Sequence, residues 1–204
     1  MPFFETGPQF CLIMRFMASS CIILCISLWT LAAHAAPPVF RYSVSTEPNS
    51  IDPARISNSE SNYFVFNVMR GLYRTSATGD VVPEIAESCR TTRSAPWITT
   101  CTLRGNVRWS DGVALKAQDV VFSWRRLLSP SAKGTGVELI KSVQGAVDAH
   151  AGKIPVEQIG IKALDARTIE IRHSEFDAEF IQKLAHPALS LVREGFSYDR
   201  TKAS

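Results

Sequence analysis

Cys89 and Cys101 are the residues of this 204-residue chain whose type and spacing point most clearly to chemistry. The eleven residues between them predict a hairpin that turns near Ser94-Ala95-Pro96. Residues equidistant from such a turn lie opposite each other on paired strands, as these cysteines nearly do. An even pair of cysteines in an oxidising compartment predicts a disulfide; two buried thiols are the alternative.

Other side chains that often carry chemistry do not form a recognisable pattern. His150, His173 and His186 are far apart in sequence and lack the spacing of metal ligands. The chain has no nucleophile elbow, zinc-protease motif, Cys-x-x-Cys pair or glycine-rich phosphate loop. We therefore predict a protein that is not an enzyme and that uses no metal and no cofactor.

Residues 1–35 have the pattern of a secretory signal peptide. Arg15 precedes the uncharged apolar run from Cys21 to Ala33, and Ala33-x-Ala35 supplies small residues for cleavage between Ala35 and Ala36. The alternative is an uncleaved membrane anchor, since the apolar stretch approaches the length of a spanning helix. Cleavage would place the mature chain outside the cytoplasm with two of the five cysteines.

The composition describes a globular protein large enough for one domain or slightly more. Hydrophobic residues make up 46% and charged residues 20%, with a net charge of +3. Lys and Arg are scattered among acidic residues, so the charge pattern does not predict binding to nucleic acid.

Several segments have the periodicity of helices or strands. Val120, Val121, Trp124, Leu127 and Leu128 share one face of a predicted helix over 116–128, which Pro130 ends. Alternation predicts a strand at 39–46, and Ser61 or Asn62 is the expected N-cap of a helix over 63–73. Further predictions are a helix over 136–150, a hairpin over 159–172 and a short helix over 177–184. This order predicts an α+β fold, or part of an α/β fold.

A series of segments resembles one protein family. In order, the segments are 47–53 (EPNSIDP), 60–62 (ESN), 70–73 (RGLY), 82–88 (VPEIAES), 109–112 (WSDG), 117–126 (AQDVVFSWRR), 159–165 (IGIKALD) and 186–187 (HP). Together they resemble the solute-binding family 5 receptors of ABC importers, specifically the kind that binds oligopeptides. The resemblance spans roughly Phe40 to Val192.

The resemblance implies a periplasmic-binding-protein-like fold of class II, with two lobes and a small extra domain. It assigns residues 36–75 to the first strand and helix of lobe I, 76–175 to the nested small α+β domain, and 176–204 to the start of a return to lobe I. It further implies a periplasmic monomer that binds an oligopeptide and meets the membrane permease subunits of an importer.

The resemblance also implies a ligand-binding segment, in which the family holds the peptide backbone. The residues that fall in this segment are Ile56, Ser57, Asn58, Ser59 and Glu60. An ordinary surface turn is the alternative interpretation.

Two departures from the family pattern affect these expectations. Residues 131–136 lack the aromatic residue that oligopeptide receptors often have there, and Cys89 stands where a Trp is usual. Family receptors are more than twice this long, so the resemblance implies an incomplete receptor without the second lobe. The alternative is an interaction fragment that does not transport, or a degenerate remnant.

Overall fold

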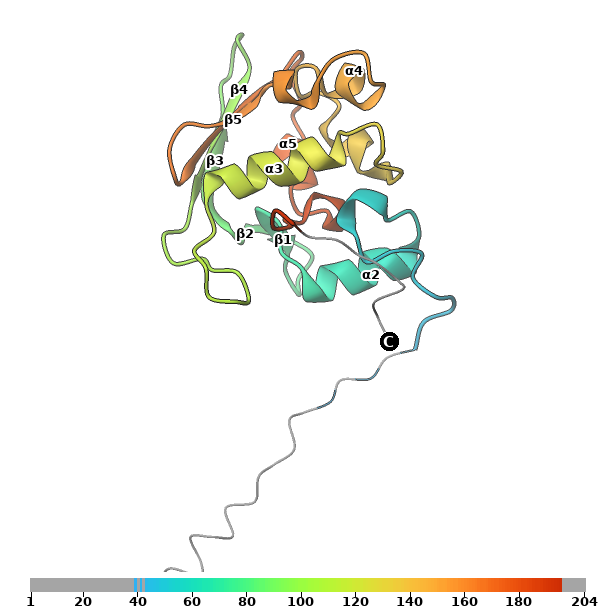
Figure 1. Cartoon of the computed structure of the whole chain (residues 1–204). Helices are drawn as coiled ribbons and strands as arrows, with labels where there is room; N and C mark the ends of the chain where they lie inside the picture. Colours follow the sequence, from blue (N-terminus) through green and yellow to red (C-terminus); the bar gives the residue numbers. More distant parts are fainter. Residues whose placement is uncertain (1–38, 40, 42, 196–204) are drawn as a thin grey trace, which may run out of the picture. The chain divides into compact units, whose positions relative to one another are not determined.

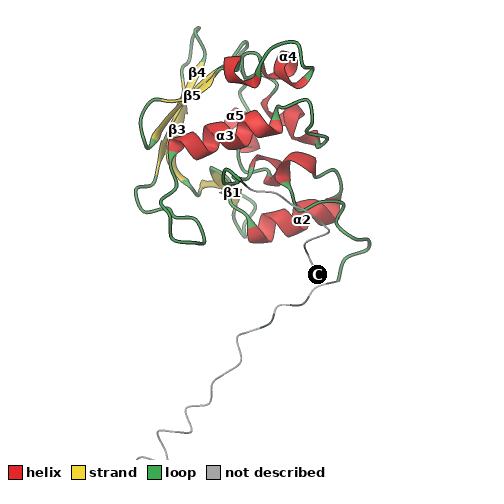
Figure 2. Cartoon of the chain, viewed as in Figure 1, coloured by secondary structure: helices red, strands yellow, loops and turns green. Residues whose placement is uncertain are grey.

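A four-stranded antiparallel sheet lies at one side of the folded part of the chain, with the long helix α3 (Ala117–Leu127) packed beside it (Figure 1). This computed structural model describes residues 39, 41 and 43–195. The chain divides into two units, Met1–Ser43 and Val44–Ser204. Every described helix and strand lies in the second unit (Figure 2). The predicted signal peptide lies outside the described residues.

The sheet consists of two hairpins joined along their inner strands. Its order is β3 (Ala86–Thr91), β4 (Ile98–Leu103), β6 (Thr168–Arg172) and β5 (Ile161–Ala163). Strand residues alternate between faces, and the residues buried on the core face of β4 and β6 are Thr99, Cys101, Leu103, Ile169 and Ile171. The hairpin predicted between Cys89 and Cys101 and the hairpin predicted over 159–172 are both confirmed.

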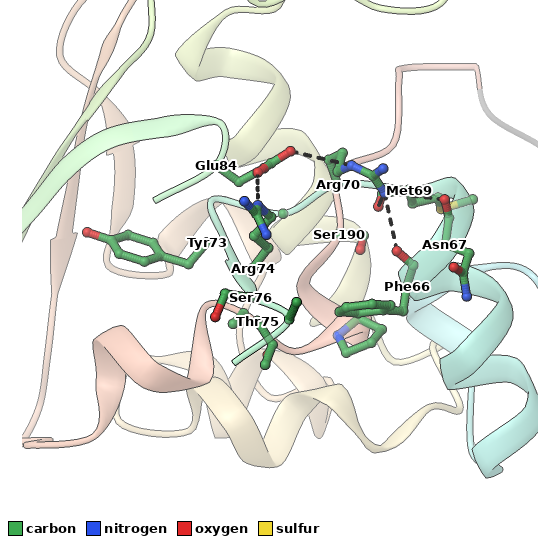
Figure 3. Close-up of a pocket in the computed structure, with 14 residues that line it drawn as sticks. Phe66, Asn67, Met69, Arg70, Tyr73, Arg74, Thr75, Ser76, Glu84 and Ser190 are labelled. Atoms are coloured by element: carbon green, nitrogen blue, oxygen red, sulfur yellow. Dashed lines mark hydrogen bonds and ion pairs between the residues drawn. The ribbon is translucent and has the colours of Figure 1, made fainter. Parts of the chain in front are cut away.

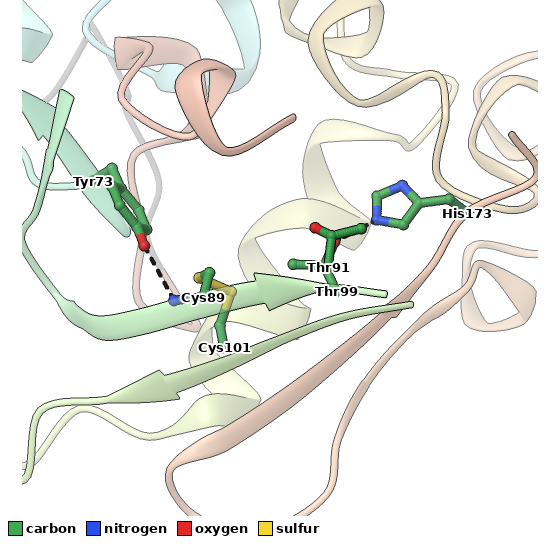
Figure 4. The surroundings of a disulfide bond; sticks show 6 residues. All are labelled: Tyr73, Cys89, Thr91, Thr99, Cys101 and His173. Atoms are coloured by element: carbon green, nitrogen blue, oxygen red, sulfur yellow. Dashed lines mark hydrogen bonds between the residues drawn. A yellow bond between two sulfur atoms is a disulfide. The ribbon is translucent and has the colours of Figure 1, made fainter. Parts of the chain in front are cut away.

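Cys89 and Cys101 face each other across β3 and β4 and form a disulfide, which confirms the predicted pairing (Figure 4). Their Cα atoms are 4.1 Å apart, the short separation of a pair that exchanges no backbone hydrogen bonds. The Cys89 amide therefore points out from the edge of the sheet, where it donates to the Tyr73 hydroxyl at 3.1 Å.

Replacing both Cys89 and Cys101 with serine is expected to lower the free energy of unfolding by about 3 kcal/mol. The bond closes a loop with a sequence separation of 12, and the chain-entropy model assigns about 3 kcal/mol to a loop of that size. Urea denaturation of the oxidised chain and of the double variant measures the difference. Equal midpoints would contradict this expectation.

Helix α3 (Ala117–Leu127) packs its apolar face against the sheet, as its sequence pattern predicts. The backbone amide of Lys116 donates to the Asp119 carboxylate at 2.8 Å, which satisfies an amide at the start of the helix. Trp124 is 1% exposed and meets Phe180 edge to face, with ring centroids 6.3 Å apart. Trp109 is partly buried and packs against the same core cluster.

Helix α2 (Ser59–Val68) and the hairpin of β1 (Tyr73–Thr75) and β2 (Val81–Pro83) form a second region. The predicted N-caps, Ser61 and Asn62, are wrong, because the helix begins earlier. Asn58 is the N-cap, and its side-chain oxygen accepts a hydrogen bond from the Ser61 amide at 3.0 Å.

The single helix predicted over 136–150 is wrong. The segment divides into the 3-10 helix η2 (Thr135–Ile140) and the α-helix α4 (Ala146–His150). Between them, Ser142 accepts a backbone hydrogen bond from Ser174, and Gly145 has φ of 76°. A positive φ interrupts a right-handed helix and is readily adopted only by glycine.

The strand predicted over 39–46 is absent from the described residues of that segment, 39, 41 and 43–46. A strand needs a neighbouring strand to take its backbone hydrogen bonds, and no described strand runs beside it. The predicted helix over 177–184 is shorter than expected, since α5 spans Phe180–Lys183. Three further 3-10 helices are η1 (Pro53–Arg55), η3 (Val156–Gln158) and η4 (Pro187–Leu189).

One buried cluster joins α3, the sheet, β1 and the segment near residue 191. The predicted division at residues 75 and 175 stays a prediction. Among the residues that the structure describes, no helix has the length and apolar character needed to cross a bilayer.

Candidate functional site

The residues predicted to contact a ligand form one continuous turn, in which residues 56–58 follow η1 and Ser59 and Glu60 are the first residues of α2. Ser57 and Ser59 are exposed, while Asn58 and Glu60 are half-buried. Ile56 is fully buried and packs with Val65 and Ala188. Its side chain therefore belongs to the core, and only its main chain could meet a ligand.

Asn49 organises this turn through its side-chain amide. Its oxygen accepts hydrogen bonds from the Ser57 amide at 3.2 Å and the Ser61 hydroxyl at 2.8 Å. Its nitrogen donates to the Arg55 carbonyl at 3.0 Å. With the Asn58 cap, these contacts fix the backbone on both sides of Ser57.

The loop after α3 lies against the same turn. The Gly134 amide donates to the Ala54 carbonyl at 3.0 Å, and the Thr135 amide donates to the Ile56 carbonyl at 3.4 Å. A Cβ atom at residue 134 would lie 2.8 Å from the Ala54 oxygen, so this approach requires glycine. The structure thus brings residues 131–136, which lack the expected aromatic, beside the predicted ligand segment.

One exposed peptide unit of the turn has no partner among the described residues. Neither the Ser57 carbonyl nor the Asn58 amide makes a hydrogen bond to another described residue. The two groups belong to the same peptide unit and point in opposite directions. A single ligand strand could therefore form a hydrogen bond with only one of them. This turn therefore offers a ligand main-chain contacts on an already ordered backbone.

A hollow of about 420 Å³ lies between α2 and β1, and sequence reasoning missed it (Figure 3). Arg70 and Arg74 both approach the Glu84 carboxylate from its rim, at 3.4 and 2.6 Å. None of the residues 56–60 lines this hollow. The sequence signal for this hollow is the spacing of Arg70 and Arg74. It is weak evidence for a site, because charged residues are common on protein surfaces.

Ser142, His173 and Asp177 come together in a buried network that is unsuited to nucleophilic catalysis. The Ser142 hydroxyl lies 3.3 Å from His173 Nδ1 and donates to Asp177 at 3.0 Å, while His173 Nε2 lies 2.8 Å from Thr99 Oγ1. Ser142 is only 2% exposed, so a substrate could not reach its hydroxyl. Lys183 also binds Asp177, at 2.8 Å.

The environment of His173 favours its neutral form. Burial lowers the pKa of His173 below the ordinary value of histidine, and the Asp177 charge offsets this only in part. Burial also lowers the pKa of His186. His186 Nδ1 accepts a hydrogen bond from the Ala188 amide at 3.1 Å and so caps η4.

Stability is expected to fall as the pH is lowered from 7 towards 5. The unfolded chain takes up a proton at a higher pH than buried His173 or His186, so stability is complete above the unfolded pKa of about 6.5 and decreases below it. His173→Asn should reduce this pH dependence, because it removes one of the two groups. Thermal unfolding of the parent and the variant across this pH range tests the expectation. An identical change of stability with pH in the two proteins would contradict it.

Metal ligands do not gather in the described part of the chain. Within residues 39, 41 and 43–195, no group of three or more His, Cys, Asp or Glu residues could hold a metal ion.

The fold of this chain is similar to part of the fold of solved oligopeptide-binding proteins. The structure of OppA from Burkholderia pseudomallei matches with a TM-score of 0.70 and 32% identity, over 74% of this chain and 30% of that chain. The substrate-binding domain of an oligopeptide ABC transporter from Bacillus anthracis matches with a TM-score of 0.72 and 28% identity, over 79% and 31%.

The family model for bacterial extracellular solute-binding proteins, family 5, matches residues 80–203, and the chain belongs to this family. The periplasmic murein peptide-binding protein MppA of Escherichia coli is 34% identical over 63% of this chain and 24% of its own length. The periplasmic oligopeptide-binding protein OppA of Escherichia coli is 31% identical over 72% of this chain and 27% of its own length. The chain thus spans about a quarter of the length of these curated relatives.

Proposed function

We propose that this chain is the part of an oligopeptide receptor of an ABC importer that forms one wall of the peptide cleft. Membership of family 5, together with peptide-binding relatives, is the observation that carries this proposal. The chain would be exported by a signal peptide cut between Ala35 and Ala36 and would act as a monomer in the periplasm. The permease subunits of the importer would be its protein partners.

The turn at residues 56–60 would hold the peptide by its main chain. Contacts to the backbone of a ligand give affinity without selecting side chains, which lets one receptor accept many peptides. The free Ser57 carbonyl and Asn58 amide suit this role, and the contacts of Asn49 and Asn58 keep them in place. Small residues in the loop at 131–136 would leave room for bulky peptide side chains.

The described chain by itself is expected to bind peptides weakly, because it spans only about a quarter of its curated relatives and supplies only part of their ligand contacts. A hybrid provides a better test of function, in which residues 44–192 replace the matching part of the Escherichia coli oligopeptide-binding protein. Isothermal titration calorimetry with mixed tri- to pentapeptides measures its affinity. Affinity within about tenfold of the parent protein supports the proposal, whereas a folded hybrid that does not bind peptides contradicts it.

Two variants of Asn58 separate the main-chain contact from the helix cap in this hybrid. Both Asn58→Pro and Asn58→Ala remove the capping side chain, at about 1 kcal/mol of stability, but only proline also removes the amide. Asn58→Pro is expected to weaken peptide binding at least fivefold more than Asn58→Ala. Equal affinities, measured by the same titration, would show that the amide does not contact the peptide.

A further inference from the structure

A continuous chain of hydrogen bonds joins the sheet to the loop that precedes α5. On the sheet side, Thr91 Oγ1 lies 2.8 Å from Thr99 Oγ1, which lies 2.8 Å from His173 Nε2 (Figure 4). On the loop side, His173 Nδ1 lies 3.3 Å from the Ser142 hydroxyl, which donates to Asp177 at 3.0 Å. Thr99, Ser142 and His173 are 0%, 2% and 8% exposed. These buried groups therefore depend on one another for their hydrogen bonds.

The contacts of Ser142 decide which ring nitrogen of His173 carries the proton. A serine hydroxyl has a single hydrogen, and here the Asp177 carboxylate takes it, because a charged acceptor forms the stronger bond. The Ser142 oxygen can then meet His173 Nδ1 only as an acceptor, so Nδ1 must carry the hydrogen. Nε2 is left as an acceptor for the Thr99 hydroxyl.

Protonation of His173 is unfavourable while the ring occupies this position. Burial lowers the pKa of His173, and the Asp177 charge opposes this only in part. Lys183 Nζ binds both Asp177 oxygens, at 2.9 and 2.8 Å, and so offsets that charge. Burial by itself would raise the pKa of Asp177, but hydrogen bonds from Lys183 and Ser142 outweigh it and lower that pKa. Asp177 therefore stays ionised between about pH 7 and pH 5, where an exposed histidine titrates.

The other charged residues along these segments face solvent. They are Lys141, Arg172, Glu175 and Glu179, and all four are exposed. Arg172 binds Glu170 at 2.9 Å on the opposite side of the strand from His173. Charges in water are screened and act weakly on a buried ring. A pH change in this range therefore acts on the network through His173.

The loop at residues 174–179 is held to the rest of the fold mainly through Ser142. The amide and the hydroxyl of Ser174 both donate to the Ser142 carbonyl, at 2.9 and 3.2 Å. Apart from Asp177, every residue of the loop is exposed. Because the loop buries little apolar surface, it can open at a lower free-energy cost than the core. Loss of the Ser142 contacts would therefore free the loop without unfolding the sheet.

We propose that His173, Ser142 and Asp177 form an acid-sensitive latch. The latch holds the loop at 174–179 while His173 is neutral with its proton on Nδ1, and it releases the loop on acidification. Release exposes the ring to water, where the charged form is stable, so opening takes up one proton from solvent. An exposed histidine has a pKa of about 6.5, so release should begin near that pH and increase as the pH falls. The latch does not depend on which solute the protein binds.

Nuclear magnetic resonance of the ¹⁵N-labelled full chain at neutral pH tests the assignment of the proton. The ring nitrogen shifts of His173 should show a protonated Nδ1 and an unprotonated Nε2, the reverse of the tautomer that free histidine prefers. His186 is the internal control, since its Nδ1 accepts a hydrogen bond from the Ala188 amide and must be unprotonated. A neutral His173 with its proton on Nε2 would overturn the proposal.

Amide hydrogen exchange at pH 7 and pH 5, each corrected for the intrinsic rate, tests the release. The amides of Ser174 and Phe180 report on the loop, because they donate to the carbonyls of Ser142 and Asp177. Their protection should fall by about fivefold or more at pH 5, while that of the β4 amides stays nearly constant. Unchanged protection of the loop would overturn the proposal. An equal loss in β4 would also overturn it, because the whole fold would then be opening.

Two histidine variants complete this experiment. His173→Asn removes the titrating group of the latch, so the protection of the loop should no longer depend on pH. His186→Asn removes the other buried histidine and should keep the response of the parent chain. A pH response that survives in His173→Asn, or that disappears only in His186→Asn, would assign the effect to another group and overturn the proposal. The measurements on the parent chain stand even where a variant does not fold.

Discussion

Replacing Trp124 with alanine is expected to lower the free energy of unfolding by about 3–5 kcal/mol, the usual cost of truncating a buried large aromatic residue. Trp124 joins the apolar face of α3 to Phe180 on α5, and its side chain is almost completely buried. Because domains of this size are stable by about 5–15 kcal/mol, the variant should lose a large share of its stability. Urea denaturation followed by circular dichroism measures the loss.

Trp124→Phe is the control for this experiment. The indole N–H of Trp124 is buried without a hydrogen-bond partner, so phenylalanine removes a polar group that gains nothing in the folded state. It also keeps an aromatic ring close to Phe180. We expect a loss below about 1.5 kcal/mol. A loss below 1 kcal/mol for Trp124→Ala itself would contradict the central place of this residue in the core.

Replacing Asp52 with asparagine is expected to lower the free energy of unfolding by about 3 kcal/mol. The Asp52 side chain is only 4% exposed, and its carboxylate accepts two hydrogen bonds from the Arg126 guanidinium, one of them at 2.6 Å. The Asp52 carboxylate also accepts a hydrogen bond from the Ala54 amide at 3.1 Å. Breaking a buried pair costs about 3–5 kcal/mol, and the low end applies here because the Arg126 side chain is 25% exposed.

Asp111→Asn is the matched control, because Asp111 pairs with Arg193 on the surface, where both side chains are 47% exposed. Exposed pairs contribute about 0–1 kcal/mol, so the control should remain near the parent stability in urea denaturation. Similar losses for both variants would contradict the structural role of Asp52. Since Asp52 caps η1 immediately before Ile56, its loss should also loosen the predicted ligand segment.

The parts of the fold that could be predicted from sequence are those specified by local patterns. The apolar face of α3 and the alternation of β5 and β6 follow directly from residue spacing. Pairing of Cys89 with Cys101 followed from their nearly equal distances to the turn. The helix over 136–150 could not be predicted correctly, because contacts of Ser142 and Val143 with residues distant in sequence interrupt it.

The candidate site was predictable only in outline. Family resemblance indicated the segment 56–60, but not that Ile56 is buried or that Asn58 caps α2. Those facts depend on Val65, Ala188 and the loop at Gly134, which reach the turn only in the folded chain. The hollow beside Arg70 was not predictable either, since it forms between α2, β1 and residues near 187.

Amide hydrogen exchange of the hybrid, with and without peptide, tests most directly whether residues 56–60 face the ligand. The Asn58 amide has no partner among the described residues and should exchange rapidly in the absence of peptide. Peptide is expected to slow exchange in residues 56–60 at least tenfold, while the outer face of β5 and β6 stays unchanged. Peptide binding that leaves exchange in residues 56–60 unaltered would contradict the account.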